Sequence, residues 1–220
     1  MTSTPPEAPA QTDQPSPPKD TPKKPARAPA VQPVLEKLFE LYPDLFGANF
    51  LPLKLGIFQE LLALHPEHFK RDTLKAALGV HTRSTRYLQC VAAGKQRHDL
   101  EGTAVGNVAA EHVYLALLEL FRRRQNRSSE DLRPKLRSQL IAAFEASGLT
   151  RQAYLAKVQT NDLDATALLE EALVEHDQKR ARQEALRRAF ESSGKTPEEF
   201  ADMYGLDKRD VMPLVASHPG

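Results

Sequence analysis

The sequence predicts a mainly α protein, in which a compact helical domain with a small β-hairpin is followed by a helical C-terminal extension. Three observations predict this class. Apolar residues recur at a helical spacing in several segments between residues 34 and 124. Proline or glycine follows several of these segments and ends them. Around Glu101 and Gly102 the pattern alternates instead, which is typical of a short hairpin.

Residues 1–32 are nearly all Pro, Ala, Thr, Gln, Ser and Lys. Such a composition cannot bury enough apolar surface to offset chain entropy, so we expect a disordered tail. The tail lacks the apolar core of a signal peptide, and no run approaches the roughly 18 apolar residues of a membrane span. We therefore expect a cytoplasmic protein without a membrane partner. The single cysteine, Cys90, excludes an internal disulfide and a cysteine zinc cluster, and no cofactor is expected.

Three helices are expected in the first half of the domain, over residues 34–42, 55–64 and 70–78. The first ends before Pro43, since the residue before a proline avoids the helical conformation, and a loop leads to the second. The third is expected to stop at Gly79.

A fourth helix is expected from Thr82 or Arg83 to Ala93, with Gly94 as its C-terminal stop. The hairpin of residues 97–105 follows, and then a longer helix over residues 109–124. The chain thus divides into a tail, a domain, a polar linker and an extension: residues 1–32, 33–125, 126–133 and 134–220.

The extension contains an internal repeat. Residues 140–158 align with residues 186–204 at an offset of 46, and seven of the 19 aligned positions are identical. Each copy predicts a helix ended by a glycine, a threonine cap and a second short helix. One long helix over residues 164–188 is expected to join these two related helical hairpins. Chance similarity between alanine-rich helices is the alternative explanation.

Positive charge is concentrated in one window, although the net charge of the chain is only +1. Residues 70–97 contain seven basic residues and a single acid, Asp72, which gives a local charge of +6. A patch of this kind attracts polyanions such as nucleic acids. An ordinary solvated basic face is the alternative.

The segment after Gly79 combines hydroxyl groups with arginines. Thr82 or Ser84 can cap the next helix, whose first amides and dipole then form a natural phosphate site. Arg83 and Arg86 lie three residues apart and share a face of the helix, beside Tyr87. Alternatively, this is an ordinary capped helix whose tyrosine belongs to the core.

Three further basic residues are candidates for a phosphate-binding surface. Lys54 begins an apolar helix, Lys75 lies on the third helix, and Arg97 lies on the hairpin. Each has an alternative role. Lys54 could simply extend its charge from apolar surroundings into water, and Lys75 could be an ordinary solvated lysine. Arg97 could be an edge-strand charge that discourages aggregation.

Several separate segments resemble the ProQ/FinO domain, a family of bacterial RNA-binding proteins, in their order and spacing over about 90 residues. The similar segments are Pro52–Phe58, Leu74–Leu78, Thr82–Leu88, Gly94 and Arg97–Gly102. The resemblance implies an RNA chaperone that binds stem-loops with a single-stranded 3′ tail, such as terminators of small RNAs and mRNAs. Such a protein stabilises its targets against 3′ exonucleases and promotes RNA–RNA pairing in post-transcriptional regulation.

The resemblance also implies where RNA binds. It places Lys54, Lys75, Arg86, Tyr87 and Arg97 on a concave face and assigns the 3′ end to the helix start at residues 82–84. With the neighbouring polar and basic side chains, the predicted RNA-binding set is Lys54, Arg71, Lys75, His81, Thr82, Arg83, Ser84, Arg86, Tyr87, Lys95 and Arg97.

The sequence departs from the family pattern at Gly79, His81, Thr85 and Cys90. Thr85 replaces an aromatic residue often found before Arg-Tyr, so base stacking is expected to be weaker or to be carried by His81. No C-terminal β-barrel is visible, and the repeat region stands in its place. Its helices offer a surface for a protein partner or for self-association.

Other classes of protein remain as alternatives. The pair His65 and His68 resembles a metal site, but Pro66 interrupts it and no nucleophile or glycine-rich phosphate loop is present, so no enzyme is expected. A helical interaction scaffold would leave the +6 window unexplained. Residues 74–88 form two expected helices around a short turn, so a duplex-DNA-binding helix-turn-helix regulator is the third alternative.

Overall fold

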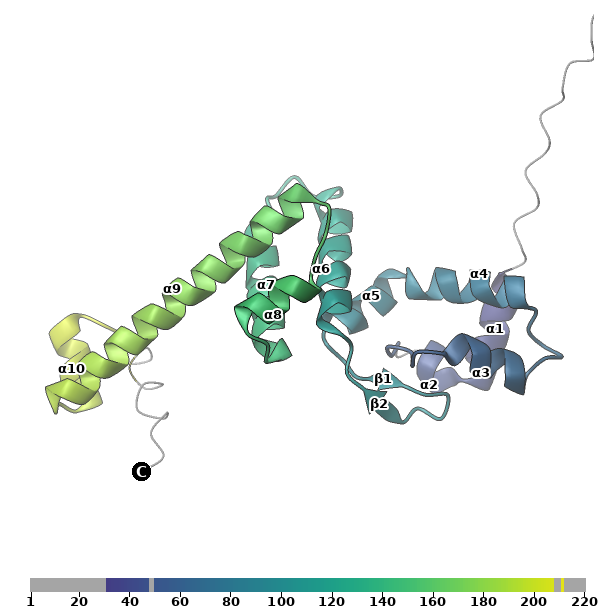
Figure 1. The fold of residues 1–220 in the computed structure, drawn as a ribbon, viewed down its shortest axis with the longest axis horizontal. Helices are drawn as coiled ribbons and strands as arrows, with labels where there is room; N and C mark the ends of the chain where they lie inside the picture. Colours follow the sequence, from purple (N-terminus) through teal and green to yellow (C-terminus); the bar gives the residue numbers. More distant parts are fainter. Residues whose placement is uncertain (1–30, 48–49, 208–210, 212–220) are drawn as a thin grey trace, which may run out of the picture.

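The computed structural model describes residues 31–47, 50–207 and 211, and these residues are mainly helical, as the sequence predicts (Figure 1). The predicted disordered tail lies outside the described residues, apart from Val31 and Gln32. The elements follow in the order α1 (Gln32–Leu41), α2 (Pro43–Phe46), α3 (Ile57–Leu64), α4 (Arg71–Thr82), α5 (Thr85–Ala92), β1 (Arg97–His98), β2 (Ala104–Gly106), α6 (Ala110–Gln125), α7 (Arg133–Ser147), α8 (Arg151–Lys157), α9 (Leu163–Ser193) and α10 (Pro197–Tyr204).

Helix α2 lies where the sequence predicts only a loop. Pro43 occupies its first turn, where the fixed backbone angle of proline suits a helix and its missing N–H is not needed. Leu45 and Phe46 from this turn are fully buried in the core. The expectation of a plain loop is therefore wrong, because a pair of large apolar side chains anchors this short segment.

Helix α4 continues through Gly79 and ends only at Thr82, so the predicted stop at Gly79 is also wrong. Gly79 does not adopt a positive φ angle. Leu74, Leu78 and His81 are buried on one side of the helix, and their packing outweighs the roughly 1 kcal/mol cost of a helical glycine. The guanidinium of Arg83 lies 3.2 Å from the position that a Cβ atom of Gly79 would occupy, so the glycine makes room for this side chain.

The predicted hairpin is present, and it has an additional partner. Strands β1 and β2 pair in antiparallel orientation, and Gly102 in their connection has a φ angle of 78°. The chain before α3 lies parallel to β1, since the Lys54 N–H donates to the His98 carbonyl and the His98 N–H donates to the Pro52 carbonyl, both at 2.8 Å. This pairing brings the start of the α3 segment against the hairpin.

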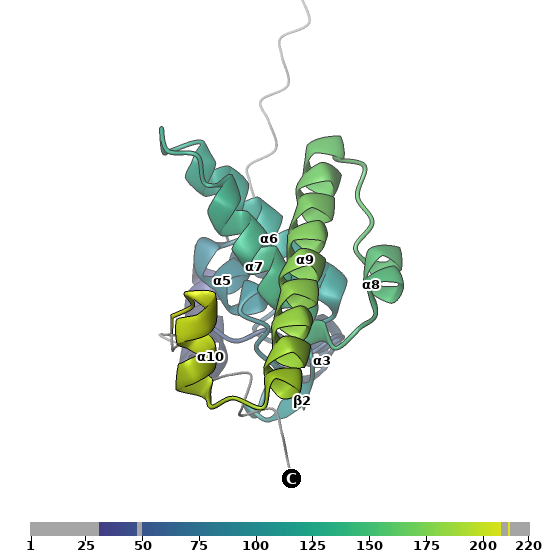
Figure 2. The same ribbon diagram turned by 90° about the vertical axis from the view of Figure 1, so that its left-hand side faces the viewer.

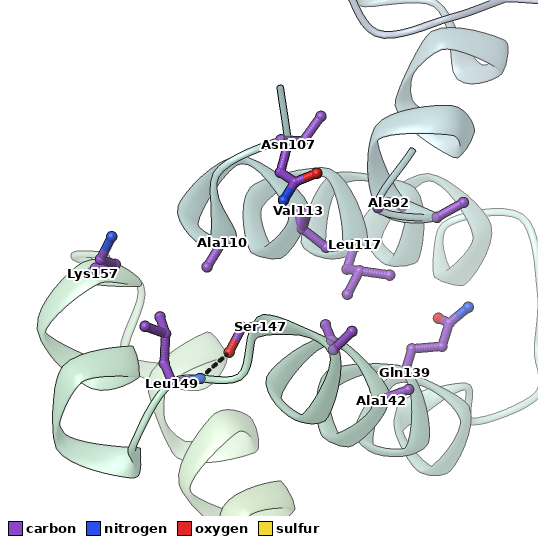
Figure 3. A pocket seen from close by; sticks show the side chains of 15 residues that line it. Ala92, Asn107, Ala110, Val113, Leu117, Gln139, Ala142, Ser147, Leu149 and Lys157 are labelled. Carbon is purple, nitrogen blue, oxygen red and sulfur yellow. Dashed lines mark hydrogen bonds between the residues drawn. The ribbon is translucent and has the colours of Figure 1, made fainter. Parts of the chain in front are cut away.

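One continuous hydrophobic core runs from α1 to the first half of α9. Helix α6 lies between α5 and α7, and the buried Tyr114 hydroxyl of α6 donates to the Ala165 carbonyl of α9 at 3.2 Å. A pocket of about 630 Å³ remains at this junction, where Val113 and Leu117 of α6 face Ala142 of α7 (Figure 3). The first repeat copy is thus packed directly on the N-terminal helices.

Both repeat copies form the hairpin that the repeat predicts. Gly148 and Gly194 end their helices with φ angles of 63° and 59°. Thr150 and Thr196 then cap α8 and α10 by accepting a hydrogen bond from the backbone N–H three residues later, at 3.3 Å in each case. An edge-to-face aromatic pair closes each hairpin, with centroid distances of 5.2 Å for Phe144–Tyr154 and 5.3 Å for Phe190–Phe200.

The second copy has a small core of its own. Phe200, Ala201 and Val211 are fully buried, and they pack with Ala189, Phe190 and Leu206. Helix α10 lies alongside the C-terminal half of α9 (Figure 2). Helix α9, 31 residues long, therefore joins two separate cores. Within the described residues, no helix combines the length and the apolar character needed to cross a membrane.

Candidate nucleic-acid interface

The backbone of Leu53 joins three of the elements that carry predicted site residues. Its N–H donates to the hydroxyl of Tyr87 on α5 at 3.1 Å, and its carbonyl accepts from Nη1 of Arg97 on β1 at 2.9 Å. Because Lys54 follows Leu53 directly, these bonds hold the segment that carries Lys54 against the strand that carries Arg97. The structure thus brings together two cation-bearing segments that lie more than 40 residues apart in the sequence.

The two cations are held differently. The Lys54 ammonium lies 2.5 Å from Oε1 of Glu60, and about 38% of its side chain is exposed. The hydrogen bond that the ammonium donates to Glu60 raises the pKa of Lys54, so the ammonium stays charged at neutral pH. The Arg97 guanidinium is half-buried, and its Nη2 lies 3.2 Å from Nδ1 of His112 on α6. Arg97 is therefore a fixed cation, whereas Lys54 can exchange its partner.

Ser84, and not Thr82, caps helix α5. The Ser84 Oγ accepts a hydrogen bond from the Tyr87 N–H at 3.2 Å. The Thr82 hydroxyl instead donates to the Leu78 carbonyl at 2.8 Å, so this residue belongs to the last turn of α4. The amides of Thr85 and Arg86 in the first turn of α5 have no acceptor within the helix, and they carry the positive end of its dipole.

Three arginines surround the start of α5. Arg83 and Arg86 are exposed, and the Arg86 guanidinium lies 6.0 Å from the centre of the Phe50 ring. Arg123 reaches the same place from α6, where its Nη1 donates to the Arg83 carbonyl at 2.9 Å and to the Thr85 hydroxyl at 3.3 Å. Arg123 is not among the residues predicted from the sequence, although the run of arginines at residues 122–124 is a visible signal.

The structure places His81 in the core. Only 3% of this residue is exposed, and its ring packs against Phe46, Phe50 and Tyr87 at centroid distances of 4.7, 4.5 and 5.3 Å. Burial lowers the pKa of His81 to about 4, so the ring is neutral at physiological pH. A base cannot stack on a ring that is already enclosed on several sides.

Tyr87 also belongs to the core. This placement agrees with the alternative in which the segment is an ordinary capped helix with a buried tyrosine. Only 7% of it is exposed, and burial raises the pKa of its phenol. Its hydroxyl contacts the Leu53 N–H, so its contribution is to position the segment that carries Lys54. The expectation that Tyr87 touches RNA through its ring is therefore not supported by its placement.

The remaining predicted residues lie on the surface around these two groups. Arg71 begins α4, with its guanidinium 5.8 Å from the centre of the Phe58 ring. Lys75 is exposed in the middle of α4, and Lys95 is exposed just after α5. Among the described residues, no hydrogen bond or ion pair holds the side chains of Lys75 and Lys95.

The histidines and the cysteine that could suggest catalytic or metal chemistry have structural surroundings. No group of three or more potential metal ligands occurs among the described residues. His65 accepts or donates a hydrogen bond at 2.7 Å with the Tyr42 hydroxyl, which gives this histidine a structural partner. Cys90 is buried, and burial raises the pKa of its thiol to about 11, so it is packed and unreactive.

Comparisons with known proteins point to one family. The sequence model of the ProQ/FINO family matches residues 28–133. The RNA chaperone ProQ of Shewanella pealeana is 42% identical over 84 residues, which cover 36% of this chain and 40% of that protein. The RNA chaperone ProQ of Shewanella frigidimarina is 37% identical over 91 residues, which cover 40% of this chain and 45% of that protein. The chain therefore spans less than half the length of these curated relatives.

Two solved structures are also similar to part of this chain. The crystal structure of a FinO-like RNA chaperone from Neisseria meningitidis MC58 has 30% sequence identity, covers 39% of this chain and 88% of that chain, and gives a TM-score of 0.36. The NMR structure of a ProQ homolog from Legionella pneumophila has 27% identity, covers 51% and 98%, and gives a TM-score of 0.38. Residues 28–133, just under half of the chain, thus match the ProQ/FINO family.

Proposed function

We propose that the protein is an RNA-binding protein and RNA chaperone that recognises stem-loops ending in a single-stranded 3′ tail. The observation that carries this proposal is the start of α5, where Ser84 caps the helix and three arginines surround its first turn. The relatives named RNA chaperones support the same class of ligand.

The start of α5 suits the terminal nucleotide of a tail. A phosphate at this position accepts hydrogen bonds from the amides of Thr85 and Arg86 and is attracted by the positive end of the helix dipole. The exposed guanidinium groups of Arg83 and Arg86 neutralise its charge. The Thr85 hydroxyl, which already accepts from Arg123, is oriented for a sugar oxygen.

The group around Leu53 suits the stem. Duplex RNA hides its base edges in a deep narrow groove, so proteins recognise its shape and backbone. A phosphate that approaches Lys54 would replace the Glu60 carboxylate, which occupies the ammonium in the free protein. Arg97 is already fixed by Leu53 and His112, so it loses little conformational entropy on binding.

Binding of the 3′ end also explains a role in the cell. A protein that covers the end of a transcript excludes 3′ exonucleases and thus stabilises its target. Neutralised phosphates also lower the repulsion between two RNA strands, so pairing of a small RNA with an mRNA becomes faster. We expect this activity in the cytoplasm.

The test is a binding titration with a terminator hairpin that ends in a free U-tract. The comparison ligands are the same hairpin with a 3′ phosphate, the hairpin without its tail, and duplex DNA as a competitor. We expect clear preference for the free tail, and we expect Arg86→Ala to weaken this binding about tenfold, or 1.4 kcal/mol.

The matched control is Arg133→Ala, because Arg133 is an exposed arginine whose ion pair is with Asp131 in the linker. This variant should bind like the wild type. Equal affinity for tailed and tailless hairpins would contradict recognition of the 3′ end. Successful competition by duplex DNA would favour the helix-turn-helix interpretation of α4 and α5.

A further inference from the structure

Helix α9 carries its charges in two separate blocks. Residues 163–177 contain five acidic residues and no lysine or arginine. Residues 178–188 contain five basic residues and one acid, Glu184. A solvent-exposed helix ordinarily mixes charges of both signs, so this segregation calls for different partners for the two blocks.

Three of the five acidic residues in the first block have partners inside the molecule. Arg137 of α7 lies 3.1 Å from Glu171 and 3.5 Å from Glu175. Arg151 at the start of α8 lies 2.5 Å from Asp177. The first half of α9 thereby docks on the first repeat copy through charge as well as through its buried residues.

The basic block begins where the packing of α9 stops. His176 is the last buried residue of the first core along α9, and residues 177–183 are all exposed. The second core begins only with the partly buried side chains of Ala189 and Phe190. About two turns of helix are thus uncovered between the two cores (Figures 1 and 2).

Three cations on these turns have no partner in the part of the chain that the structure describes. Among the described residues, none bonds or pairs with the side chains of Lys179, Arg180 and Arg182. The arginines further along differ, because Arg187 and Arg188 both pair with Glu184 at 2.9 Å. We call Lys179, Arg180 and Arg182 the α9 cation segment.

We propose that the α9 cation segment is a second RNA contact, which binds the phosphate backbone away from the 3′ end. This inference rests on the proposed RNA-binding function. The segment between Asp177 and Glu184 reads Gln-Lys-Arg-Ala-Arg-Gln and contains no large apolar side chain. A protein interface needs buried apolar or aromatic anchors, whereas phosphate binding needs only cations, so RNA is the partner that fits.

The position of the helix decides which part of an RNA it reaches. Helix α9 runs away from α6 on the side opposite to α4 and α5 (Figure 1). An RNA whose 3′ end lies at the start of α5 therefore meets the α9 cation segment only if its duplex part is long enough. The contact is independent of sequence, because every duplex presents the same backbone charge.

The test compares two hairpins that share one loop and one 3′ tail but differ in stem length. The full-length variant Lys179→Gln, Arg180→Gln, Arg182→Gln removes three charges while it keeps residues of similar helix propensity. The matched control is Lys135→Gln, Lys157→Gln, Lys195→Gln, which removes the same charge from exposed but scattered positions of the extension. Far-UV circular dichroism shows that each variant keeps its helices.

We expect the wild type to bind the long hairpin more tightly than the short one. The variant of the α9 cation segment should lose this advantage, and its plot of log K against log salt should be shallower by about 2 to 3 for the long hairpin. It should bind the short hairpin like the wild type, and the control should behave like the wild type with both.

An unchanged salt slope and affinity of the variant for the long hairpin would overturn the inference. An equal loss in the control would also overturn it, because net charge alone would then explain the effect. Failure of the proposed function looks different, since the wild type would then bind neither hairpin.

Discussion

His81 carries a polar ring into an aromatic cluster, and this placement has a cost that depends on pH. Its Nε2 atom is buried and has no hydrogen-bond partner within the described part of the chain. The sequence favoured an RNA contact because hydroxyls and arginines surround His81, whereas its burial depends on Phe46 and Phe50, which come from a different segment. A cap at Thr82 or Ser84 could be predicted, because a cap is set by neighbours in the sequence, and the structure selects Ser84. Arg123 could not be placed, because its contact at α5 spans about 40 residues.

We predict that His81 makes the protein less stable as the pH falls. The pKa of His81 is lowered from 6.5 to about 4 in the folded state, so between these values the unfolded chain binds the proton and the folded chain does not. The free energy of unfolding is therefore unaffected by His81 above pH 6.5 and decreases as the pH falls toward 4. At pH 5 the loss due to His81 is about 2 kcal/mol. Urea unfolding at pH 7.5 and pH 5 measures the difference.

The variant His81→Phe should lose this part of the pH dependence, since a phenyl ring suits the aromatic neighbours and does not titrate. The control His68→Gln alters a histidine whose side chain is 40% exposed, and it should keep the dependence. The same pH dependence in the wild type and in His81→Phe would assign the effect to other groups.

The hairpin elements of the extension show what a sequence repeat can predict. Glycine stops and threonine caps depend on a few adjacent residues, so both copies could be predicted from the alignment alone. The stop at Gly79 failed for the opposite reason. Its helix is held by Leu74, Leu78 and His81 against distant parts of the core, and such packing leaves no local signal.

We predict that the two equivalent glycines differ in their effect on stability. An added Cβ at Gly148 or Gly194 meets nothing within 4 Å, so alanine there costs only the strain of the left-handed conformation, about 1 to 2 kcal/mol. Gly148→Ala should lower the stability of the large core. Gly194→Ala should loosen only the small core around Phe200 and Ala201.

A urea titration followed by NMR resolves the two cores, with the amides of Ala172 and Ala201 as reporters. Gly106→Ala is the control, because Gly106 has no positive φ angle and has open space beside it. If both repeat variants shift both reporters equally, the two cores unfold as one unit.

The whole molecule consists of a large core and a small one on a shared helix. The first repeat copy shares its core with the family domain, whereas the second depends on α9 for its connection. Sequence periodicity predicted the long helix but not this division. The residues that cover the first half of α9 come from α6, α7 and α8, and only the fold reveals them.

We predict that amide hydrogen exchange divides α9 into segments of unequal protection. Residues 163–176 pack on the large core and should exchange slowly, together with the buried helix α6. Residues 177–183 are exposed all round, so their amides should exchange faster by local opening. Exchange measured on the full-length chain by mass spectrometry or NMR gives this profile. Uniform protection along α9 would contradict a helix that joins two separately packed bodies.

Because α9 is continuous between its two cores, the rotational phase of a helix sets the direction in which the second copy points. Each residue advances an α-helix by roughly 100° and 1.5 Å. One alanine inserted after Arg180 would therefore swing α10 about a quarter turn around the axis while moving it hardly at all along it. Insertion of a whole turn would nearly restore the direction and change only the reach. The number of residues in the uncovered stretch thus fixes the direction of α10 around the helix axis. Insertion or deletion of a single residue there can reorient one end of the molecule without repacking either core.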